Sequence, residues 1–234
     1  MNTSIDEIAP RVFRISTPVD TPDGFGFSFN QYLITAEEPV LWHTGPRGLF
    51  ELTRTAIARV MAPEKLRWIG YSHFEADECG AMNNFLAIAP NAQPVCGRIG
   101  AMVNGDAADK PTRALADGEV LDVGGARLRW MDTPHLPHGW DAGLVYDEAG
   151  GTLFCGDLFT QGGKSHAPVT ESDILGPSEA FRGPLDYFAH SASTRTQLER
   201  LAALKPQTLA CMHGSAWRGD GAGLLRELAG RLYA

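Results

Sequence analysis

Residues able to bind a metal recur in four short segments, each of which follows strand-like sequence. The segments are SHFEADECG (72–80), DTPHLPHGWD (132–141), LFCGDLF (153–159) and CMHGS (211–215). Strand ends in a two-layer β core can converge on one cleft, and loops there commonly carry function. A lone histidine or aspartate at a strand end is more often a capping or surface residue than a ligand. Four such segments in one chain predict a metal site to which all of them contribute.

The first segment is the densest of the four. It places His73, Glu75, Asp77, Glu78 and Cys79 within seven positions. An acidic helix N-terminus is the alternative interpretation, because carboxylates stabilise that end of a helix. That alternative explains this segment alone, whereas a metal site explains why similar residues recur in the other three.

Composition narrows the class of protein. The 234 residues carry a formal net charge of −8, and 44% of them are hydrophobic. Nucleic-acid and anionic-membrane partners require clustered Lys and Arg, so neither is expected. No run of about 18 apolar residues is present, and the N-terminus lacks the pattern of a signal peptide. Four cysteines without a CxxC pair predict a reduced, cytoplasmic protein.

Local patterns predict strands and helices in a twice-repeated order. The expected strands are 11–16, 29–35, 39–45, 66–72, 92–97 and 208–214, with hairpins over 119–134 and 140–157. The expected helices are 49–61, 80–89, 193–204 and 222–233, and 161–178 is expected to be a Gly/Pro-rich loop. This order predicts an α+β fold in one domain, residues 1–234, with two packed sheets and helices outside.

The first segment resembles a known family motif. It is similar to the metallo-β-lactamase fold superfamily, and within it to the oxygen-binding di-iron branch typified by flavodiiron proteins. Hydrolases of the superfamily show H-x-H-x-D-H, and the di-iron branch shows H-x-E-x-D-H-x-G. This chain reads His73-Phe-Glu75-Ala-Asp77-Glu78-Cys-Gly80, with Glu78 in place of a histidine. The resemblance implies a metallo-β-lactamase αββα sandwich.

Further matches extend from about Val12 to Trp217. NQYLI resembles a second-strand pattern, and LWHTG stands where IDTG is usual, with His43 in place of the aspartate. His138-Gly-Trp-Asp141 fits the family spacing of a ligand histidine, with His135 as the competitor.

Carried over residue by residue, the resemblance implies two metal ions. One is held by His73, Glu75 and His138, and the other by Asp77 and His213, with Asp157 bridging both. Glu78 has three interpretations: it ligates the second metal, it hydrogen-bonds a bound water, or it turns away to solvent.

The carboxylates indicate which metal is expected. Imidazole and thiolate ligands suit zinc, whereas hard carboxylate ligands favour iron or manganese. Glu75, Asp77 and Asp157 supply three negative charges, and Glu78 would supply a fourth, which lowers the cost of burying two cations. Iron is therefore the expected metal, with zinc or manganese as alternatives.

Two classes of reaction fit such a site. The first is binding or reduction of O2 or NO by a stand-alone di-iron oxidoreductase or oxygen sensor. Family enzymes take electrons from a fused flavodoxin-like domain, and this chain has no flavin fingerprint, so a separate flavoprotein donor is expected. The alternative is hydrolysis of an ester, thioester or lactone by a metal-bound hydroxide that Asp77 orients. A degenerate, non-catalytic site is a third hypothesis, which Glu78 keeps open.

Other histidines and the cysteines lie outside the implied ligand set. His43 and His190 are expected to be structural, and His166 to be a surface histidine or part of a gate over the cleft. The cysteines are expected to be small buried residues, with an oxidation-sensitive thiol as the alternative. Ser72, Asp132 and Asp141 are candidate hydrogen-bond partners for the ligand histidines. The resemblance also implies a homodimer.

Overall fold

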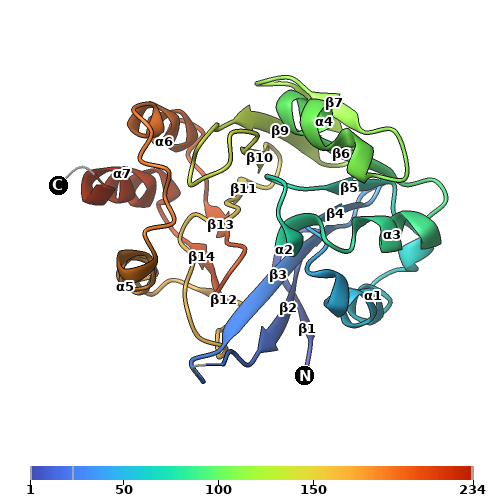
Figure 1. The fold of residues 1–234 in the computed structure, drawn as a ribbon, viewed down its shortest axis with the longest axis horizontal. Helices are drawn as coiled ribbons and strands as arrows, with labels where there is room; N and C mark the ends of the chain where they lie inside the picture. Colours follow the sequence, from blue (N-terminus) through green and yellow to red (C-terminus); the bar gives the residue numbers. More distant parts are fainter. Residues whose placement is uncertain (1, 23, 233–234) are drawn as a thin grey trace.

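Two sheets lie face to face in the computed structural model, which describes residues 2–22 and 24–232 (Figure 1). In the described residues the first sheet has seven strands in chain order. They are β1 (Ser4–Ala9), β2 (Val12–Val19), β3 (Phe27–Ile34), β4 (Val40–Trp42), β5 (Trp68–Gly70), β6 (Gln93–Gly97) and β7 (Arg113–Leu115). The strands pair antiparallel from β1 to β4 and parallel from β4 to β7.

The second sheet runs in the order β12-β14-β13-β11-β10-β9-β8 over the same described ranges. Its strands are β8 (Val120–Asp122), β9 (Arg127–Asp132), β10 (Gly143–Asp147), β11 (Thr152–Phe154), β12 (Val169–Thr170), β13 (Thr208–Ala210) and β14 (Ala216–Arg218). Strand β11 pairs parallel with β13, and β12 pairs parallel with β14, whereas the other pairs are antiparallel.

Helices cover the outer faces of both sheets. They are α1 (Phe50–Ile57), α2 (Ala76–Cys79), α3 (Met82–Ile88), α4 (Arg98–Asn104), α5 (Leu175–Leu185), α6 (Thr194–Ala202) and α7 (Gly221–Leu232). Three short 3-10 turns, η1 (Arg47–Leu49), η2 (Pro63–Lys65) and η3 (Gly105–Ala107), complete the described elements. None of the described helices combines the length and apolar character needed to cross a bilayer.

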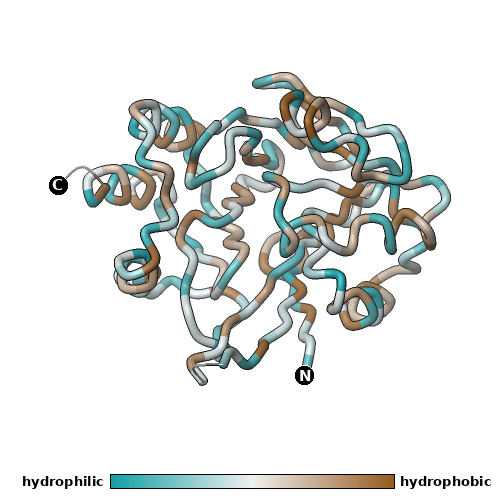
Figure 2. The backbone as a smooth tube through the Cα atoms, viewed as in Figure 1, coloured by the Kyte–Doolittle hydropathy of each residue, from teal (hydrophilic) through white to brown (hydrophobic). Residues whose placement is uncertain are grey.

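The buried side chains form three layers that account for this architecture. The middle layer joins both sheets through residues such as Trp42, Trp130 and Phe154. One outer layer packs α1 and α3 against the first sheet, and the other packs α5, α6 and α7 against the second. Figure 2 shows that these outer helices carry both hydrophobic and hydrophilic residues, as expected for helices with one buried side. The αββα sandwich predicted from the sequence is confirmed.

Several helix boundaries differ from the sequence prediction. Helix α5 begins inside the expected loop 161–178 despite Pro177, and it contains Pro184. Pro177 is tolerated because it lies in the first turn, where its missing N–H has no helical acceptor. Burial of Leu175 in the outer layer on the second sheet offsets the low helix propensity of Pro184. Helix α1 ends at Ile57 and not at 61, and α7 is described to Leu232, so residue 233 of the expected helix lies outside the described residues.

Hydrogen bonds tie the two sheets together at one end of the strands. The Gly143 amide at the start of β10 donates to the Ser72 carbonyl at 2.9 Å. The Asn30 side-chain amide donates to the carbonyls of Cys211 and Gly214 at 2.9 and 2.8 Å. Two of these residues, Ser72 and Gly214, are adjacent to His73 and His213, so the sheets are joined next to the histidines of the segments singled out in the sequence.

Close packing of glycine against tryptophan in the middle layer predicts a mutational effect. A Cβ on Gly143 would lie 2.0 Å from the Trp130 ring, which is 1% exposed. Gly143→Ala should therefore lower the free energy of unfolding by about 1–3 kcal/mol, because the core has no room for the methyl group. Denaturant unfolding followed by circular dichroism measures this.

Gly230→Ala is the matched control, because nothing lies within 4 Å of a Cβ at this position on α7. The control should unfold at the same or a higher denaturant concentration, since alanine favours a helix over glycine by about 1 kcal/mol. Equal midpoints for Gly143→Ala and the wild type would contradict the prediction.

Candidate metal centre

The four segments singled out in the sequence meet at one end of the sandwich. His73 follows β5 of the first sheet by three residues, and α2 begins three residues after His73. Asp157 and His213 each follow their strands by three residues, and those strands, β11 and β13, are parallel neighbours with Phe154 opposite Ala210. His138 lies in the loop between β9 and β10. Both sheets therefore supply side chains to the same place.

Four side chains form the first ligand group: His73, Glu75, His138 and Asp157, whose candidate ligand atoms all lie within 4.8 Å of one another. The Nε2 atom of His138 lies 3.1 Å from Glu75 Oε1 and 3.3 Å from Asp157 Oδ2. The Nε2 atom of His73 lies 3.4 Å from the same Asp157 oxygen and 3.7 Å from Glu75 Oε1. These four side chains surround one point.

The second ligand group consists of Asp77, Glu78 and His213, whose candidate ligand atoms also lie within 4.8 Å of one another. His213 Nε2 lies 3.4 Å from Asp77 Oδ2 and 3.3 Å from Asp157 Oδ1. Asp157 therefore directs Oδ2 to the first group and Oδ1 to the second. This is the arrangement of a carboxylate placed between two cation sites.

Several polar atoms of these groups are buried without a hydrogen-bond partner among the described residues. They are His73 Nε2, His138 Nε2, Asp157 Oδ1 and both carboxylate oxygens of Glu78. A buried polar atom without a partner costs free energy comparable to a lost hydrogen bond. Lone pairs of five such atoms, from imidazoles and carboxylates, make a donor set that fits metal ions.

The other ring nitrogen of each ligand-group histidine has a defined partner. His138 Nδ1 lies 3.1 Å from the Tyr187 carbonyl, and His213 Nδ1 lies 2.9 Å from the Ser28 carbonyl. His73 Nδ1 lies 3.0 Å from the Ser72 hydroxyl. A carbonyl only accepts, so His138 and His213 carry their protons on Nδ1 when neutral, which leaves the Nε2 lone pairs directed at the centre.

The electrostatics of the centre follow from burial and from the opposed charges. Burial by itself raises the pKa of Asp157, but contact with His213 and the nearby charges of His73 and His138 hold that pKa well below its usual range. Contact with His138 and His73 lowers the pKa of Glu75 to about 2.

The pKa values of three side chains in the ligand groups are raised. Burial lowers the pKa of His138, but contact with Glu75 and the charge of Asp157 outweigh it and raise that pKa. Burial lowers the pKa of His213, but Asp157 and Asp77 outweigh it and raise that pKa to about 9. Burial raises the pKa of Glu78, and the neighbouring carboxylates of Asp157 and Asp77 raise it further. The centre therefore binds protons in place of other cations when it is metal-free.

The positions of these side chains bear on two alternatives that the sequence leaves open, namely His135 versus His138 and the direction of Glu78. His135 is exposed and belongs to neither ligand group, whereas His138 lies in the first. Glu78 is 0% exposed, so the interpretation in which it turns away to solvent is wrong: α2 directs it inward, 3.9 Å from His73 Nε2. Of the three candidate partners for the ring nitrogens, only Ser72 is seen to bond a ligand-group histidine among the described residues.

The other two candidate partners have different roles. Asp141 accepts from the Phe74 amide and from Asn104, and Asp132 accepts from the Trp130 indole. Asp141 thereby holds the backbone between His73 and Glu75. Nothing in the local sequence pattern distinguishes this backbone contact from a contact with a histidine ring.

Some residues around the centre were missed from the sequence. His43 is 1% exposed, and its Nε2 atom lies 3.0 Å from the Ser72 hydroxyl. The signal was its position near the C-terminal end of the predicted strand 39–45, in LWHTG, where a ligand-type side chain stands at a strand end as in the other segments. The carbonyls of Ser28 and Tyr187 could not be found, because backbone groups carry no sequence signature. All four cysteines are buried and unpaired, as expected.

The remaining two histidines, His166 and His190, belong to neither ligand group. His166 Nε2 contacts the Gly163 carbonyl at 3.0 Å, and exposed His190 contacts Asp186 at 2.6 Å. The assignment of His190 as structural therefore agrees with its contact, and neither residue belongs to a ligand group.

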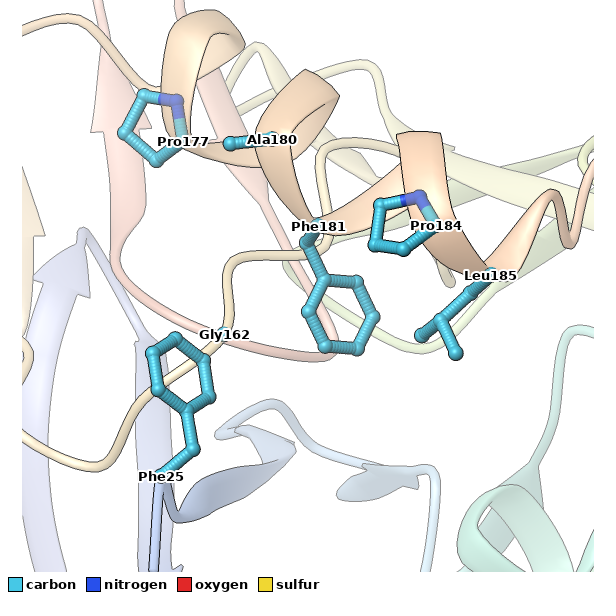
Figure 3. Close-up of a pocket in the computed structure, with 7 residues that line it drawn as sticks. All are labelled: Phe25, Gly162, Pro177, Ala180, Phe181, Pro184 and Leu185. Atoms are coloured by element: carbon cyan, nitrogen blue, oxygen red, sulfur yellow. The ribbon is translucent and has the colours of Figure 1, made fainter. Parts of the chain in front are cut away.

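An apolar pocket of about 430 Å³ lies between helix α5 and the segments that carry Phe25 and Gly162 (Figure 3). Its lining consists of Phe25, Gly162, Pro177, Ala180, Phe181, Pro184 and Leu185. The Phe181 ring stacks on Phe27 at 5.4 Å, and Phe27 in turn lies 4.3 Å from the His213 ring. One aromatic ring therefore separates the pocket from the second ligand group.

Comparison with known proteins gives several relatives of the same kind. A protein of Nostoc sp. (strain PCC 7120) that carries the name diflavin flavoprotein A 1 is 27% identical over 198 residues, which are 81% of this chain and 33% of that protein. An anaerobic nitric oxide reductase flavorubredoxin of Pectobacterium carotovorum is 28% identical over 86% of this chain and 41% of its own. The chain thus spans less than half the length of these relatives.

Solved structures share the fold. The rubredoxin oxygen:oxidoreductase of Desulfovibrio gigas superposes with a TM-score of 0.79 at 19% identity, over 98% of this chain and 60% of that one. A flavodiiron core from Synechocystis sp. gives a TM-score of 0.80 at 20% identity, over 99% and 60%. At these identities the superpositions establish the fold alone.

A family model described as "ODP family beta lactamase" matches residues 27–214, which include every side chain of both ligand groups. The predicted resemblance is confirmed: the chain belongs to the ODP family of β-lactamase-fold proteins.

Proposed function

We propose that the two ligand groups hold two metal ions, with Asp157 between them. The first ion would be bound by His73, Glu75 and His138, and the second by Asp77, Glu78 and His213. The observation that carries this proposal is the position of Asp157, whose two oxygens face histidines of different groups at 3.3–3.4 Å. The buried, unpartnered atoms of both groups support it.

Iron is the metal that the donor set favours. Four carboxylates and three imidazoles surround the two positions, and no thiolate belongs to either ligand group. Hard oxygen ligands favour iron or manganese over zinc, and four negative charges balance two divalent cations. The chain is therefore proposed to bind two iron ions, with manganese or zinc as the metals that compete for the same ligands.

The proposed activity is binding or reduction of O2 or NO. Bound ferrous ions would supply electrons to such a small molecule. The names of two relatives, an oxygen:oxidoreductase and a nitric oxide reductase, support this class of substrate. A separate flavoprotein is the proposed electron donor. Within this chain, the ligand groups bind and neutralise the ions, and the hydrogen-bonded Nδ1 atoms fix the orientation of the rings.

The decisive experiment is a spectrum of the iron-loaded protein. Ferrous-loaded protein prepared without oxygen should change its visible absorption when O2 or NO is admitted, and Asp157→Asn should abolish the change, because the bridging carboxylate is lost. An unchanged spectrum from protein with two bound irons would contradict the proposal. Turnover of an ester, thioester or lactone panel by the metal-loaded protein would then favour hydrolysis.

Glu78 gives a second prediction, on metal content. Glu78→Gln should lower the affinity for one of the two ions, since it removes a buried negative charge from the second group. Glu78→His should retain two ions per chain, because imidazole is also a ligand. Metal analysis after dialysis measures both, with the exposed Glu64→Gln as control. Full retention of both ions by Glu78→Gln would assign Glu78 to a role other than ligation.

Competition with protons gives a third prediction. In the metal-free protein His213 has a pKa of about 9, so near neutral pH it must lose a proton before it can bind a metal. Metal affinity should therefore rise with pH, by up to about tenfold per pH unit for one released proton, and level off as the pH passes about 9.

Zinc titrations across this range test the pH dependence without redox chemistry. A variant of the exposed His190, such as His190→Gln, should keep the same slope. An affinity that stays constant from neutral pH to about 9 would contradict the assignment of His213 as a protonated ligand.

A further inference from the structure

His43 lies directly behind the metal centre, although it is in neither ligand group. It follows β4, whose last residue Trp42 pairs with Gly70 of the parallel strand β5, so His43 and Ser72 come out of neighbouring strands. His43 Nε2 lies 3.0 Å from the Ser72 hydroxyl and 3.3 Å from the Ser72 backbone nitrogen. The same hydroxyl lies 3.0 Å from His73 Nδ1. The three side chains form a continuous chain of contacts.

One backbone amide determines the direction of every hydrogen bond in this chain of contacts. The Ser72 N–H only donates, so His43 Nε2 must be the unprotonated, accepting nitrogen. The Ser72 hydroxyl, close to the same nitrogen, then donates its single proton to His43. Its oxygen is left to accept from His73 Nδ1–H. The Nε2 lone pair of His73 consequently points to Glu75, Glu78 and Asp157.

The tautomers of His138 and His213 are determined without a third residue. Their Nδ1 atoms face the carbonyls of Tyr187 and Ser28, and a carbonyl accepts only. A serine hydroxyl both donates and accepts, so Ser72 alone would tolerate either tautomer of His73. A third group is required to orient that hydroxyl, and His43 is in contact with it.

We propose that His43 is a positioning residue, which acts through Ser72 to hold the proton of His73 on Nδ1 and to keep Nε2 free for a metal ion. This inference rests on the proposed metal site. The proposed role also places a neutral hydrogen-bond acceptor at the position where LWHTG has His43 in place of the usual aspartate. The chain thus orients His73 without adding another buried negative charge to a centre that already holds four carboxylates.

The backbone around His43 is held on both sides. His43 N donates to the Gly70 carbonyl at 2.8 Å, and Thr44 N donates to the Glu78 carbonyl at 2.7 Å. His43 has a φ of 63°, a left-handed conformation that non-glycine residues rarely adopt and that recurs at functional sites. Burial lowers the pKa of His43 to about 3, so the ring stays neutral and its Nε2 remains an acceptor near neutral pH.

Nitrogen NMR of the wild-type protein tests the proposal without any substitution. In the metal-free and the zinc-loaded protein, His43 should show a protonated Nδ1 and an unprotonated Nε2. In the zinc-loaded protein, His73 should show a proton on Nδ1. A proton on His43 Nε2 would overturn the proposal, because the Ser72 amide and hydroxyl would then have no acceptor there.

A double-mutant cycle tests whether His43 acts through Ser72. His43→Leu and Ser72→Ala should each weaken the binding of the zinc ion that shifts the His73 resonances, by about 10–100-fold. The double variant should be no weaker than Ser72→Ala alone, because the two residues serve one hydrogen-bonded chain. His43→Gln, which keeps an acceptor at similar reach, should restore binding, and His190→Leu is the control at an exposed histidine.

The results distinguish this inference from the proposed function. Additive losses in the double variant, or unchanged zinc binding by folded His43→Leu, would overturn the role of His43 even if the iron-loaded protein responds to O2 or NO. Non-additive losses with the predicted tautomers would support it even if no such response is found. If His43→Leu does not fold, the wild-type NMR and the His43→Gln comparison still decide.

Discussion

The centre is constrained by the convergence of four carboxylates and three imidazoles on a small buried space. Asp157, Glu78 and His73 are almost completely removed from solvent, and their inward-facing atoms meet one another and not hydrogen-bond donors. Like charges at this spacing repel unless cations lie between them. The raised pKa of His213 and the lowered pKa of Asp157 are two consequences of that single constraint.

The sandwich supplies the rigidity that this convergence requires. Asp157 and His213 follow parallel neighbours of one sheet, whereas His73 follows a strand of the other. The Gly143–Ser72 and Asn30–Cys211 hydrogen bonds join the two sheets next to these residues. Ligands placed on short connections after buried strands vary little in position, which is how a site of this kind is preorganised.

Departures from the hydrolase and di-iron patterns change the charge of the centre in opposite directions. Glu75 and Glu78 add negative charge where hydrolases carry histidines, which favours iron over zinc and weakens a bound metal as a Lewis acid. His43 removes a negative charge from the layer behind His73. A neutral residue at that position adds no further negative charge to the four carboxylates of the ligand groups.

The sequence was sufficient to identify the family, the αββα class and the ligand-group residues other than His138, because HFEADE, FCGDLF and MHGS keep side-chain types at fixed spacing after strands. It did not show helix α5, which has Pro177 in its first turn and Pro184 near its end, or the choice between His135 and His138, which are three residues apart in one loop. The inward direction of Glu78 and the contact of His43 with Ser72 follow from the packed structure and not from the sequence. Both depend on contacts between segments about thirty residues apart, and such contacts are set by packing and not by local pattern.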